Sequence, residues 1–395
     1  MKILSVCLMI DGLYLATGKA SQARLLADRL HRAGVSVSVI NIKPARPGGP
    51  DNSPECRFNT PPLSQEISVS EIASPDRLKQ LWLLRKRYKT VCFVGNNYRI
   101  WLFAFLKIIR KKVVILFSSR YQPERISFYQ KNWLWADRLI AVSPALENDL
   151  RKSSGARAFQ RKVVTILNKV DENAIREINR ARKKELRKRL GLESSSKIVI
   201  FVGGVQYAKG VDLLLDSWRI VRERVSSAQL LILGPLCSLC PDNVDYRGVN
   251  GTGRSLLADK MEIFSSKLSS LIQLHERISY LGVKSDVSDY LAASDLFVFP
   301  SRTEVSPNAP MEAMAAGLPV IAFDNKEVIG EIVRNGREGT LVPDGDAGAL
   351  AEAVILLLND DETRRRLGEN ARQRFKSDLV FDDRQTKKFM EALKL

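Results

Sequence analysis

The sequence contains few of the residues on which several classes of protein depend. Its 395 residues include only five cysteines and two histidines. An odd and sparse set of cysteines excludes a disulfide-stapled scaffold and indicates a reducing compartment. Cys237 and Cys240 form a single C-x-x-C pair without the second pair that a structural zinc site needs. Packing is therefore the favoured interpretation of this pair, over metal binding or redox chemistry.

Long hydrophobic runs are also absent. No stretch approaches the roughly 20 apolar residues that a membrane-spanning helix requires. The start, MKILSVCLMIDG, resembles a signal peptide, but its apolar run ends at Asp11 and lacks a small-residue cleavage site. We interpret it as a buried first strand. The expected location is cytoplasmic, with peripheral association at the inner face of the membrane as an open possibility.

Several catalytic signatures are missing as well. The chain has no nucleophile elbow, no H-E-x-x-H motif, no Walker loop and no G-x-G-x-x-G. His31 and His275 are expected to be structural. Asp344 and Asp346 flank Gly345 in a turn, where metal binding is not expected. The sequence therefore predicts no metal site.

Charge is distributed unevenly. Residues 1–175 hold 29 Lys and Arg against 13 Asp and Glu, a balance of +16, whereas residues 176–395 hold 33 against 31. A basic first half suits nucleic acid, anionic lipid or an anionic polymer, and charge alone does not choose among them. The segment YRIWLFAFLKIIRKK, residues 98–112, is apolar with a basic end, and it fits either a helix that covers a sheet or a membrane-facing helix. The basic stretch 176–189 is expected to be a solvated helix face.

Short apolar strands alternate with helices in two runs, which predicts parallel sheets covered on both faces. Strands are expected at residues 3–10, 35–42, 90–94, 113–117, 139–142, 197–202, 229–233, 277–281, 296–300 and 319–323. Helices are expected at 18–33, 78–88, 177–190, 211–224, 309–316, 347–358, 362–375 and 382–393, and residues 43–75 at a long loop. The fold class is therefore α/β, with two Rossmann-like, doubly wound domains. We place them at 1–172 and 173–376, followed by a C-terminal helix in 377–395 that could return to the first domain.

The first candidate site is FVGGVQYAKGVDLLL, residues 201–215. A buried strand ends at Gly203 and Gly204, where the backbone can approach a phosphate, and Lys209 can add positive charge beside it. The alternative is an ordinary strand–turn–helix with a solvated lysine.

The second candidate is SRTEVSPNAPMEAMAAGLPVIA, residues 301–322. We expect Glu304 on a loop and Glu312 within a short helix that Gly317 ends. The amides at the start of this helix are candidates for an anion site, formed by Ser306, Pro307, Asn308 and Ala309. The alternative is an acid that stabilises the helix dipole, plus a solvated glutamate.

The third candidate is LATGKASQ, residues 15–22. Gly18 and Lys19 precede or open a predicted helix, where an anion or polar substrate could bind. A simple helix start is the alternative.

With these motifs in order, the chain resembles a retaining glycosyltransferase of the GT-B class, of the family-four (glycosyl transferases group 1) type. The resemblance is strongest from residue 197 to 375. It is carried by FVGGVQYAKGVDLLL, RISYLGVKSDVSDYLAASDLFVFPSRTE, EVSPNAPMEAMAAGLPVIA with its Glu-seven-residues-Glu spacing, and EIVRNGREGTLVPDGDAGALAEAV. Weaker matches in the first half are ATGKASQ, ADRLIAVSPAL and ILNKVD.

The resemblance implies two domains that face each other across a cleft. The first would bind the acceptor, and the second a nucleotide-sugar donor. It implies that Lys209 contacts the diphosphate, Glu304 the donor sugar and Glu312 the ribose. Amides of residues 306–309 would hold phosphate, Val283 and Lys284 would lie by the base, and Gly18 with Lys19 would approach the donor from the first domain.

The implied activity is transfer of a hexose, from a donor that is expected to be a UDP-sugar, to a cell-envelope glycan or glycolipid. No cofactor or metal ion is implied, and a nucleic acid partner is not expected. The sequence departs from the family pattern at Gly204, where Arg is usual, and at Val305 and Lys19, where Gly is usual. A nucleotide-sugar epimerase and a degenerate, non-catalytic relative are the alternatives.

Overall fold

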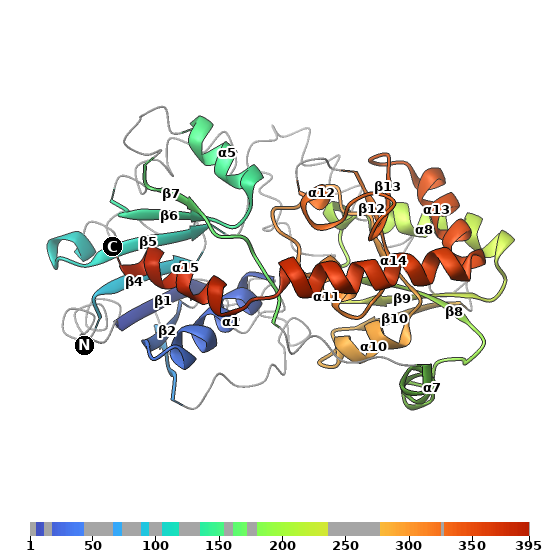
Figure 1. The fold of residues 1–395 in the computed structure, drawn as a ribbon, viewed down its shortest axis with the longest axis horizontal. Helices are drawn as coiled ribbons and strands as arrows, with labels where there is room; N and C mark the ends of the chain where they lie inside the picture. Colours follow the sequence, from blue (N-terminus) through green and yellow to red (C-terminus); the bar gives the residue numbers. More distant parts are fainter. Residues whose placement is uncertain are drawn as a thin grey trace. The chain divides into compact units, whose positions relative to one another are not determined.

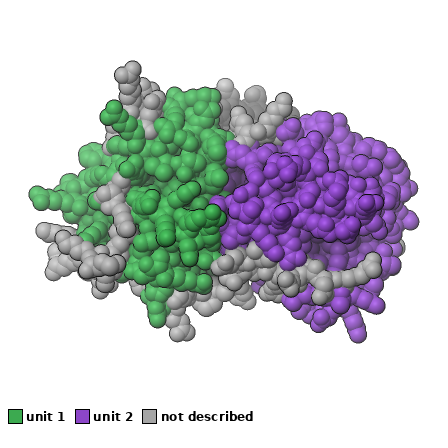
Figure 2. All heavy atoms as spheres, viewed as in Figure 1, with its two compact units in different colours: residues 1–168, 381–395 green, residues 169–380 purple. Residues whose placement is uncertain are grey.

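The computed structural model describes residues 5–11, 18–42, 66–72, 88–94, 105–117, 135–153, 161–171, 180–235, 277–324 and 328–394. These residues form two compact units (Figure 2). Unit 1 consists of residues 1–168 with 381–395, and unit 2 of residues 169–380. The sequence boundary was expected after residue 172, and the contacts place it after residue 168.

Unit 1 is built on a seven-stranded parallel sheet with the order β3-β2-β1-β4-β5-β6-β7 (Figure 1). Its strands are β1 (Ser5–Asp11), β2 (Ser36–Ile42), β3 (Ser68–Ile72), β4 (Thr90–Val94), β5 (Lys112–Phe117), β6 (Arg138–Ala141) and β7 (Val163–Thr165). Its helices include α1 (Gly18–Arg32), α5 (Pro144–Ser153) and α15 (Asp383–Lys394). The strand order reverses between β1 and β4, as in a doubly wound fold.

Unit 2 repeats this design on a six-stranded parallel sheet with the order β10-β9-β8-β11-β12-β13. Its strands are β8 (Lys197–Val202), β9 (Ala228–Leu233), β10 (Ile278–Gly282), β11 (Leu296–Phe299), β12 (Val320–Phe323) and β13 (Gly339–Val342). Its helices are α7 (Arg180–Arg189), the 3₁₀ turn η6 (Tyr207–Lys209), α8 (Val211–Arg224), α10 (Val287–Ala293), α11 (Asn308–Ala315), α12 (Ile329–Ile332), α13 (Ala347–Asn359), α14 (Asp361–Arg374) and the π-helical turn η8 (Phe375–Leu379). Both units thus confirm the expected Rossmann-like, doubly wound architecture.

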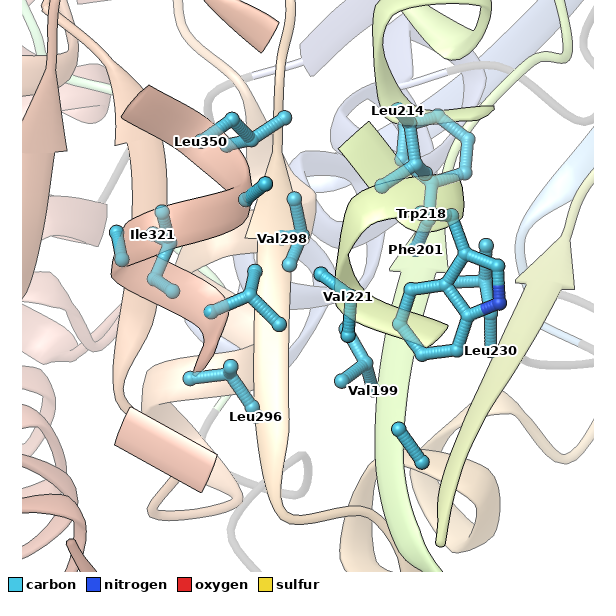
Figure 3. Packing of buried hydrophobic residues seen from close by; sticks show 14 of the residues in the cluster. Val199, Phe201, Leu214, Trp218, Val221, Leu230, Leu296, Val298, Ile321 and Leu350 are labelled. Atoms are coloured by element: carbon cyan, nitrogen blue, oxygen red, sulfur yellow. The ribbon is translucent and has the colours of Figure 1, made fainter. Parts of the chain in front are cut away.

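Both faces of the unit 2 sheet are buried, which explains its nearly continuous apolar strands. On one face, Trp218 of α8 packs with Phe201 of β8 and Leu230 of β9, while Leu350 of α13 packs over the strand side chains of β11 and β12 (Figure 3). On the other face of the sheet, Met311 and Met314 of α11 pack against the strand side chains that point to that face. The sheet is therefore fixed in the middle of the unit, and its carboxyl-end loops project from a rigid base.

Two strands of unit 1 were not predicted from the sequence. The long loop expected at residues 43–75 contains strand β3, Ser68–Ile72, which pairs in parallel with β2. β3 is an edge strand with one neighbouring strand, and its sequence, SVSEI, is short and largely polar. The spacing of its hydrophobic residues was therefore too weak a signal to predict it. Strand β7, three residues long, was also missed. The helix expected at 78–88 lies outside the described residues, apart from Tyr88.

The basic helix α7 is not simply a solvated face. The Arg187 side chain is only 9% exposed and donates to Asp295 at 2.7 Å, and Lys183 reaches the same carboxylate at 2.6 Å. Asp295 also accepts the backbone N–H of Ile198 at 2.7 Å. Burial alone would raise the pKa of the Asp295 carboxyl, but the two cations outweigh it and hold that pKa below its ordinary value. The charge of α7 thus fastens it to the starts of β8 and β11.

The final helix, α15, returns to unit 1. Its Leu393 carbonyl accepts a hydrogen bond of 3.0 Å from Thr90 at the start of β4, although 303 positions separate the two residues. Gln385 at the other end of the helix donates to the Leu167 carbonyl. The expected C-terminal helix therefore packs on the first sheet.

Candidate functional site

The loops that follow β8 and β11 meet at the carboxyl end of the unit 2 sheet. These two strands are neighbours, and the strand order reverses between them. In doubly wound sheets the crevice at this reversal is where ligands bind, because the two loops diverge to opposite faces. Both glutamates of residues 301–322, and Lys209, come from these loops or from the helix that follows.

Gly210 brings the two loops into direct contact. It adopts a left-handed conformation with φ of 66°, between η6 and α8. A Cβ atom at this position would lie 1.8 Å from the Pro300 carbonyl oxygen, at the end of β11. Only glycine allows this backbone approach. The turn that carries Lys209 is therefore seated against the strand that leads to Glu304.

Lys209 and Glu304 form an ion pair across this junction. The Lys209 Nζ atom lies 2.5 Å from Glu304 Oε1. Ser301 donates its hydroxyl to the same oxygen at 2.8 Å. The Glu304 side chain is only 9% exposed, and that of Lys209 25%. The two candidate residues are 95 positions apart in the sequence, yet they present a positive and a negative group side by side.

Arg302 forms a second connection between the same two loops. Its guanidinium donates to both carboxylate oxygens of Asp212 in α8, each at 2.7 Å, and to the Tyr207 carbonyl at 2.5 Å. It also lies over the Tyr207 ring, 4.0 Å from the ring centroid. Its backbone N–H donates to the Ala208 carbonyl at 3.0 Å. The Glu304 loop is thus tied to η6 and α8 at several points.

Glu312 lies within α11, as expected from the sequence. Burial raises the pKa of its carboxyl above the ordinary value. Solvent still reaches part of the residue. Among the described residues, none donates a hydrogen bond to this carboxylate and no cation pairs with it. A desolvated carboxylate without a protein partner, beside the loop of Glu304, is suited to accept hydrogen bonds from ligand hydroxyl groups.

The start of α11 has the form expected for an anion site. The helix begins at Asn308 after Pro307, whose side chain cannot cap it. Pro310 lies in the first turn, and Gly317 ends the segment with φ of 76°. Ser306, Pro307, Asn308 and Ala309 lie together at this positive end of the helix, close in sequence to Glu304.

The remaining unit 2 candidates lie on the neighbouring loops of the same sheet edge. Gly203 directly follows β8 and donates its N–H to the Leu233 carbonyl at 2.9 Å, and Gly204 comes next. Gly234, with φ of 138°, packs so closely that a Cβ would lie 2.0 Å from the Gly203 oxygen. Its N–H donates to the Gly282 carbonyl at 2.8 Å, directly before Val283 and Lys284, which are both partly exposed. The loops after β8, β9 and β10 are therefore joined through backbone contacts.

Gly18 and Lys19 are the first two residues of α1, as expected. They belong to unit 1, which is described separately from unit 2. The structure therefore brings Lys209 and Glu304 together, and α11 begins four residues after Glu304. The contribution of Gly18 and Lys19 stays a prediction.

Sequence reasoning missed Ser301, Arg302, Asp212 and Gly210. The first two precede Glu304 directly in PSRTE, and the last two surround the start of α8 in KGVD. A glycine immediately before a predicted helix was a usable signal for Gly210. The Arg302–Asp212 contact spans 90 positions, and nothing local in the sequence points to it.

The other candidates that lie within the described residues do not form a second site. Asp346 accepts the Ala349 N–H at 2.8 Å and caps α13, which explains the acidic turn without a metal ion. His31 lies 2.8 Å from the Glu66 carboxylate. In the part of the chain that the structure describes, no group of three or more His, Cys, Asp or Glu residues is arranged to hold a metal ion. Cys237, Cys240 and His275 lie outside the described residues.

Comparison with known proteins bears on these loops. Residues 182–374 match the family described as "Glycosyl transferases group 1". The chain is 26% identical over 255 residues to the N-acetyl-alpha-D-glucosaminyl L-malate synthase of Bacillus anthracis, which covers 64% of this chain and 59% of that protein. It is 31% identical over 186 residues to the lipopolysaccharide core biosynthesis mannosyltransferase LpsB of Rhizobium meliloti, covering 45% and 46%. The chain thus spans less than two thirds of the length of these curated relatives.

Solved structures resemble nearly the whole chain. HepE of Anabaena, in complex with UDP and glucose, has a TM-score of 0.74 at 18% identity and covers 98% of this chain and 99% of its own. WaaG, a glycosyltransferase involved in lipopolysaccharide biosynthesis, has a TM-score of 0.68 at 15% identity and covers 99% of each chain. At this identity the likeness concerns the fold, and it confirms the GT-B fold class that the sequence motifs indicated.

Proposed function

Since residues 182–374 match the glycosyl transferases group 1 family and the chain has the GT-B fold, we propose that this protein is a glycosyltransferase. It would move a hexose from a nucleotide sugar, UDP-linked in our proposal, to a cell-envelope glycan or glycolipid, with retention at the reacting carbon. The observation that carries this proposal is the Lys209–Glu304 pair at the strand reversal of unit 2.

This pair supplies the two kinds of contact that a sugar diphosphate needs. The Lys209 ammonium would balance the charge of the diphosphate, which increases as the sugar–phosphate bond breaks. The Glu304 carboxylate would accept hydrogen bonds from donor-sugar hydroxyls. Amides at the start of α11 would hold a phosphate together with the positive end of the helix dipole. The contacts through Ser301 and Arg302 fix these groups before a ligand arrives.

Glu312 would hold the ribose of the nucleotide. Its carboxylate has no hydrogen-bond donor or cation paired with it among the described residues, and it lies in α11, the helix that follows the Glu304 loop. The loop with Val283 and Lys284 would lie by the base. Position 204 is glycine, where the family resemblance implies an arginine, and this leaves Lys209 as the cation of the β8 loop in this proposal.

The proposal needs no metal ion and no cofactor. Lys209 and the backbone amides of α11 would stabilise the negative charge of the leaving diphosphate. The proposed arrangement assigns no separate catalytic base. The acceptor itself would hold the attacking hydroxyl. Retention then requires attack on the same face from which the diphosphate leaves.

Different observations support the proposed acceptor and the proposed location. Curated relatives include enzymes named for lipopolysaccharide core and capsular polysaccharide biosynthesis, and a related acceptor is our proposal for this chain. Among the described helices, none is long and apolar enough to cross a membrane. Cys7 and Cys92 are free thiols, which agrees with a reducing compartment. A peripheral position at the cytoplasmic face of the membrane is our proposal for its location.

Nucleotide binding and transfer test the proposal separately. Thermal shift with UDP, GDP, ADP and CDP should show stabilisation by one of them, UDP in our proposal, and that nucleotide's sugars should then be transferred to a lipid extract. Lys209→Ala should abolish transfer, whereas Lys197→Ala, on the same unit, should not. The Lys197 side chain donates a hydrogen bond to Asn359 at 3.3 Å. Absence of nucleotide binding, donor hydrolysis and transfer would refute the function, and turnover of donor alone into an epimer would favour an epimerase.

A further inference from the structure

A row of positive residues crosses the amino end of the unit 1 sheet. All seven strands are parallel, so their first residues lie along one edge. Four neighbouring strands begin beside cations. The Lys112 N–H donates to the Lys89 carbonyl at 3.0 Å, and Leu139, directly after Arg138, donates to the Lys162 carbonyl at 2.9 Å. These residues therefore lie side by side across β4, β5, β6 and β7.

The charge along this edge is mostly positive. In the segments 88–90, 105–113, 135–138 and 161–163 there are eight lysines and arginines and one acid. The acid is Asp137, and its carboxylate accepts hydrogen bonds from Lys107 at 2.5 Å and from the Val113 N–H at 2.7 Å. We call the following residues the basic edge: Lys89, Arg110, Lys112, Arg138 and Arg161. Lys89, Arg110 and Arg161 are exposed to solvent.

Two large apolar side chains project beside the basic edge. Ile108 is 78% exposed and Trp135 is 39% exposed. Ile108 follows Lys107, and Trp135 is two residues before Asp137, so the Lys107–Asp137 ion pair ties their two segments together. Leaving an isoleucine in water on a folded unit forgoes the stabilisation that burial would give it. The side chains of Ile108 and Trp135 are therefore available to insert into an external apolar phase.

Arg110 adds an independent observation. Residues 105–108 are helical, and the helix ends where Arg110 and Lys111 donate to the carbonyls of Lys107 and Leu106, at 2.9 and 2.8 Å. This closing pattern places Arg110 in the left-handed region, with φ of 55°. Glycine normally occupies such a position, because side chains are strained there. Of the described residues other than glycine, Arg110 alone has a positive φ, and it lies where its charge joins the basic edge.

We propose that the basic edge, with Ile108 and Trp135, is a docking surface for an anionic lipid bilayer. Cations near an anionic membrane surface are attracted to it, and tryptophan and aliphatic side chains insert at the boundary between headgroups and acyl chains. A soluble polyanion would use the charges but gain little from Ile108. A second copy of this edge would be repelled by its like charge. The inference rests on the proposed peripheral location and is independent of the transfer reaction.

Vesicle flotation tests the surface without any donor or acceptor. The wild-type protein should float with phosphatidylcholine vesicles that contain phosphatidylglycerol, but not with phosphatidylcholine alone, and high salt should weaken binding. Lys89→Gln with Arg110→Gln should weaken it about 30-fold, at roughly fivefold for each cation. Ile108→Ser should weaken it too. Two variants on unit 2 serve as matched controls. Leu356→Ser removes an apolar side chain that is 64% exposed, and Arg365→Gln removes a cationic side chain that is 68% exposed. Neither control should change binding.

Arg110→Gly separates loss of binding from loss of folding. Because glycine suits the left-handed conformation, this variant should melt at a higher temperature than the wild type. Its vesicle binding should nevertheless fall about fivefold. Failure of the wild type to float with anionic vesicles would overturn the proposal, as would unchanged binding by the double variant. Binding of heparin without binding of vesicles would assign the edge to a soluble polyanion instead. Loss of transfer activity alone would affect only the proposed function.

Discussion

Arg302 and Asp212 form a two-fold hydrogen-bonded ion pair, with both N–H···O distances at 2.7 Å. The arginine lies two residues before Glu304, and the aspartate three residues after Lys209. The pair therefore holds the two loops that present the candidate reacting groups. Both side chains are about one-fifth exposed, which limits screening by water.

Arg302→Lys should lower transfer more than it lowers stability. Lysine keeps the charge but cannot donate two parallel hydrogen bonds to Asp212 and also reach the Tyr207 carbonyl. We expect a loss of about 1–2 kcal/mol in the free energy of unfolding, together with a fall in kcat that exceeds any rise in KM for the donor. Urea unfolding and steady-state kinetics measure the two effects. Arg224→Lys is the control, because the Arg224–Glu352 pair is half exposed and remote in sequence from the site. Equal losses in both variants would contradict a positioning role.

Glu312→Ala should weaken nucleotide binding by about 2 kcal/mol, or roughly 30-fold, because charge-assisted hydrogen bonds to the ribose hydroxyls would be lost. Titration calorimetry with UDP measures this. Since burial raises the pKa of Glu312, affinity should also increase as the pH rises through that raised pKa and the carboxylate forms. Glu352→Ala, which removes an exposed carboxylate of α13, should bind like the wild type. Unchanged affinity in Glu312→Ala would remove the residue from the site.

Gly210→Ala should be far more damaging than alanine at another left-handed glycine. A Cβ at Gly210 would meet the Pro300 carbonyl at 1.8 Å, whereas Gly336, with φ of 75°, has no atom within 4 Å of that position. Gly336→Ala should cost about 1 kcal/mol from backbone strain alone. Gly210→Ala should cost at least about 3 kcal/mol, because the β8 and β11 loops must separate. The midpoints of urea unfolding compare the two, and similar midpoints would show that the loops yield easily.

Glu331 should make stability depend on pH. Burial raises the pKa of its carboxyl from the ordinary 4.5 to about 7. Between these values the folded protein binds more protons than the unfolded chain, so the free energy of unfolding should fall as pH rises through this window. Glu331→Gln should remove that dependence and stabilise the protein above pH 7 by about 1 kcal/mol, a figure reduced for its partly exposed carboxyl. Thermal melts across this pH range provide the test, and an unchanged slope in the variant would refute the assignment.

The expected fold was obtained from local patterns, and its errors have physical causes. Strand β8 was predicted at its observed bounds, because it is buried on both faces and reads as a continuous apolar run. Edge strand β3 was not predicted, because one of its sides has no neighbouring strand and its sequence is therefore less apolar. The charges of α7 suggested solvent exposure, since no local signal shows that Asp295, more than 100 positions away, would accept Lys183 and Arg187.

The sequence by itself determined the two doubly wound sheets, the loop and helix positions of Glu304 and Glu312, and the turn that carries Lys209. These features follow from hydrophobic period, glycine and proline, which act over a few residues. The tertiary structure alone decided that Lys209 meets Glu304, that Arg302 meets Asp212, and that cations from four strands share one edge. Such contacts join residues far apart in the chain, and parallel strand order, rather than local sequence, places them together.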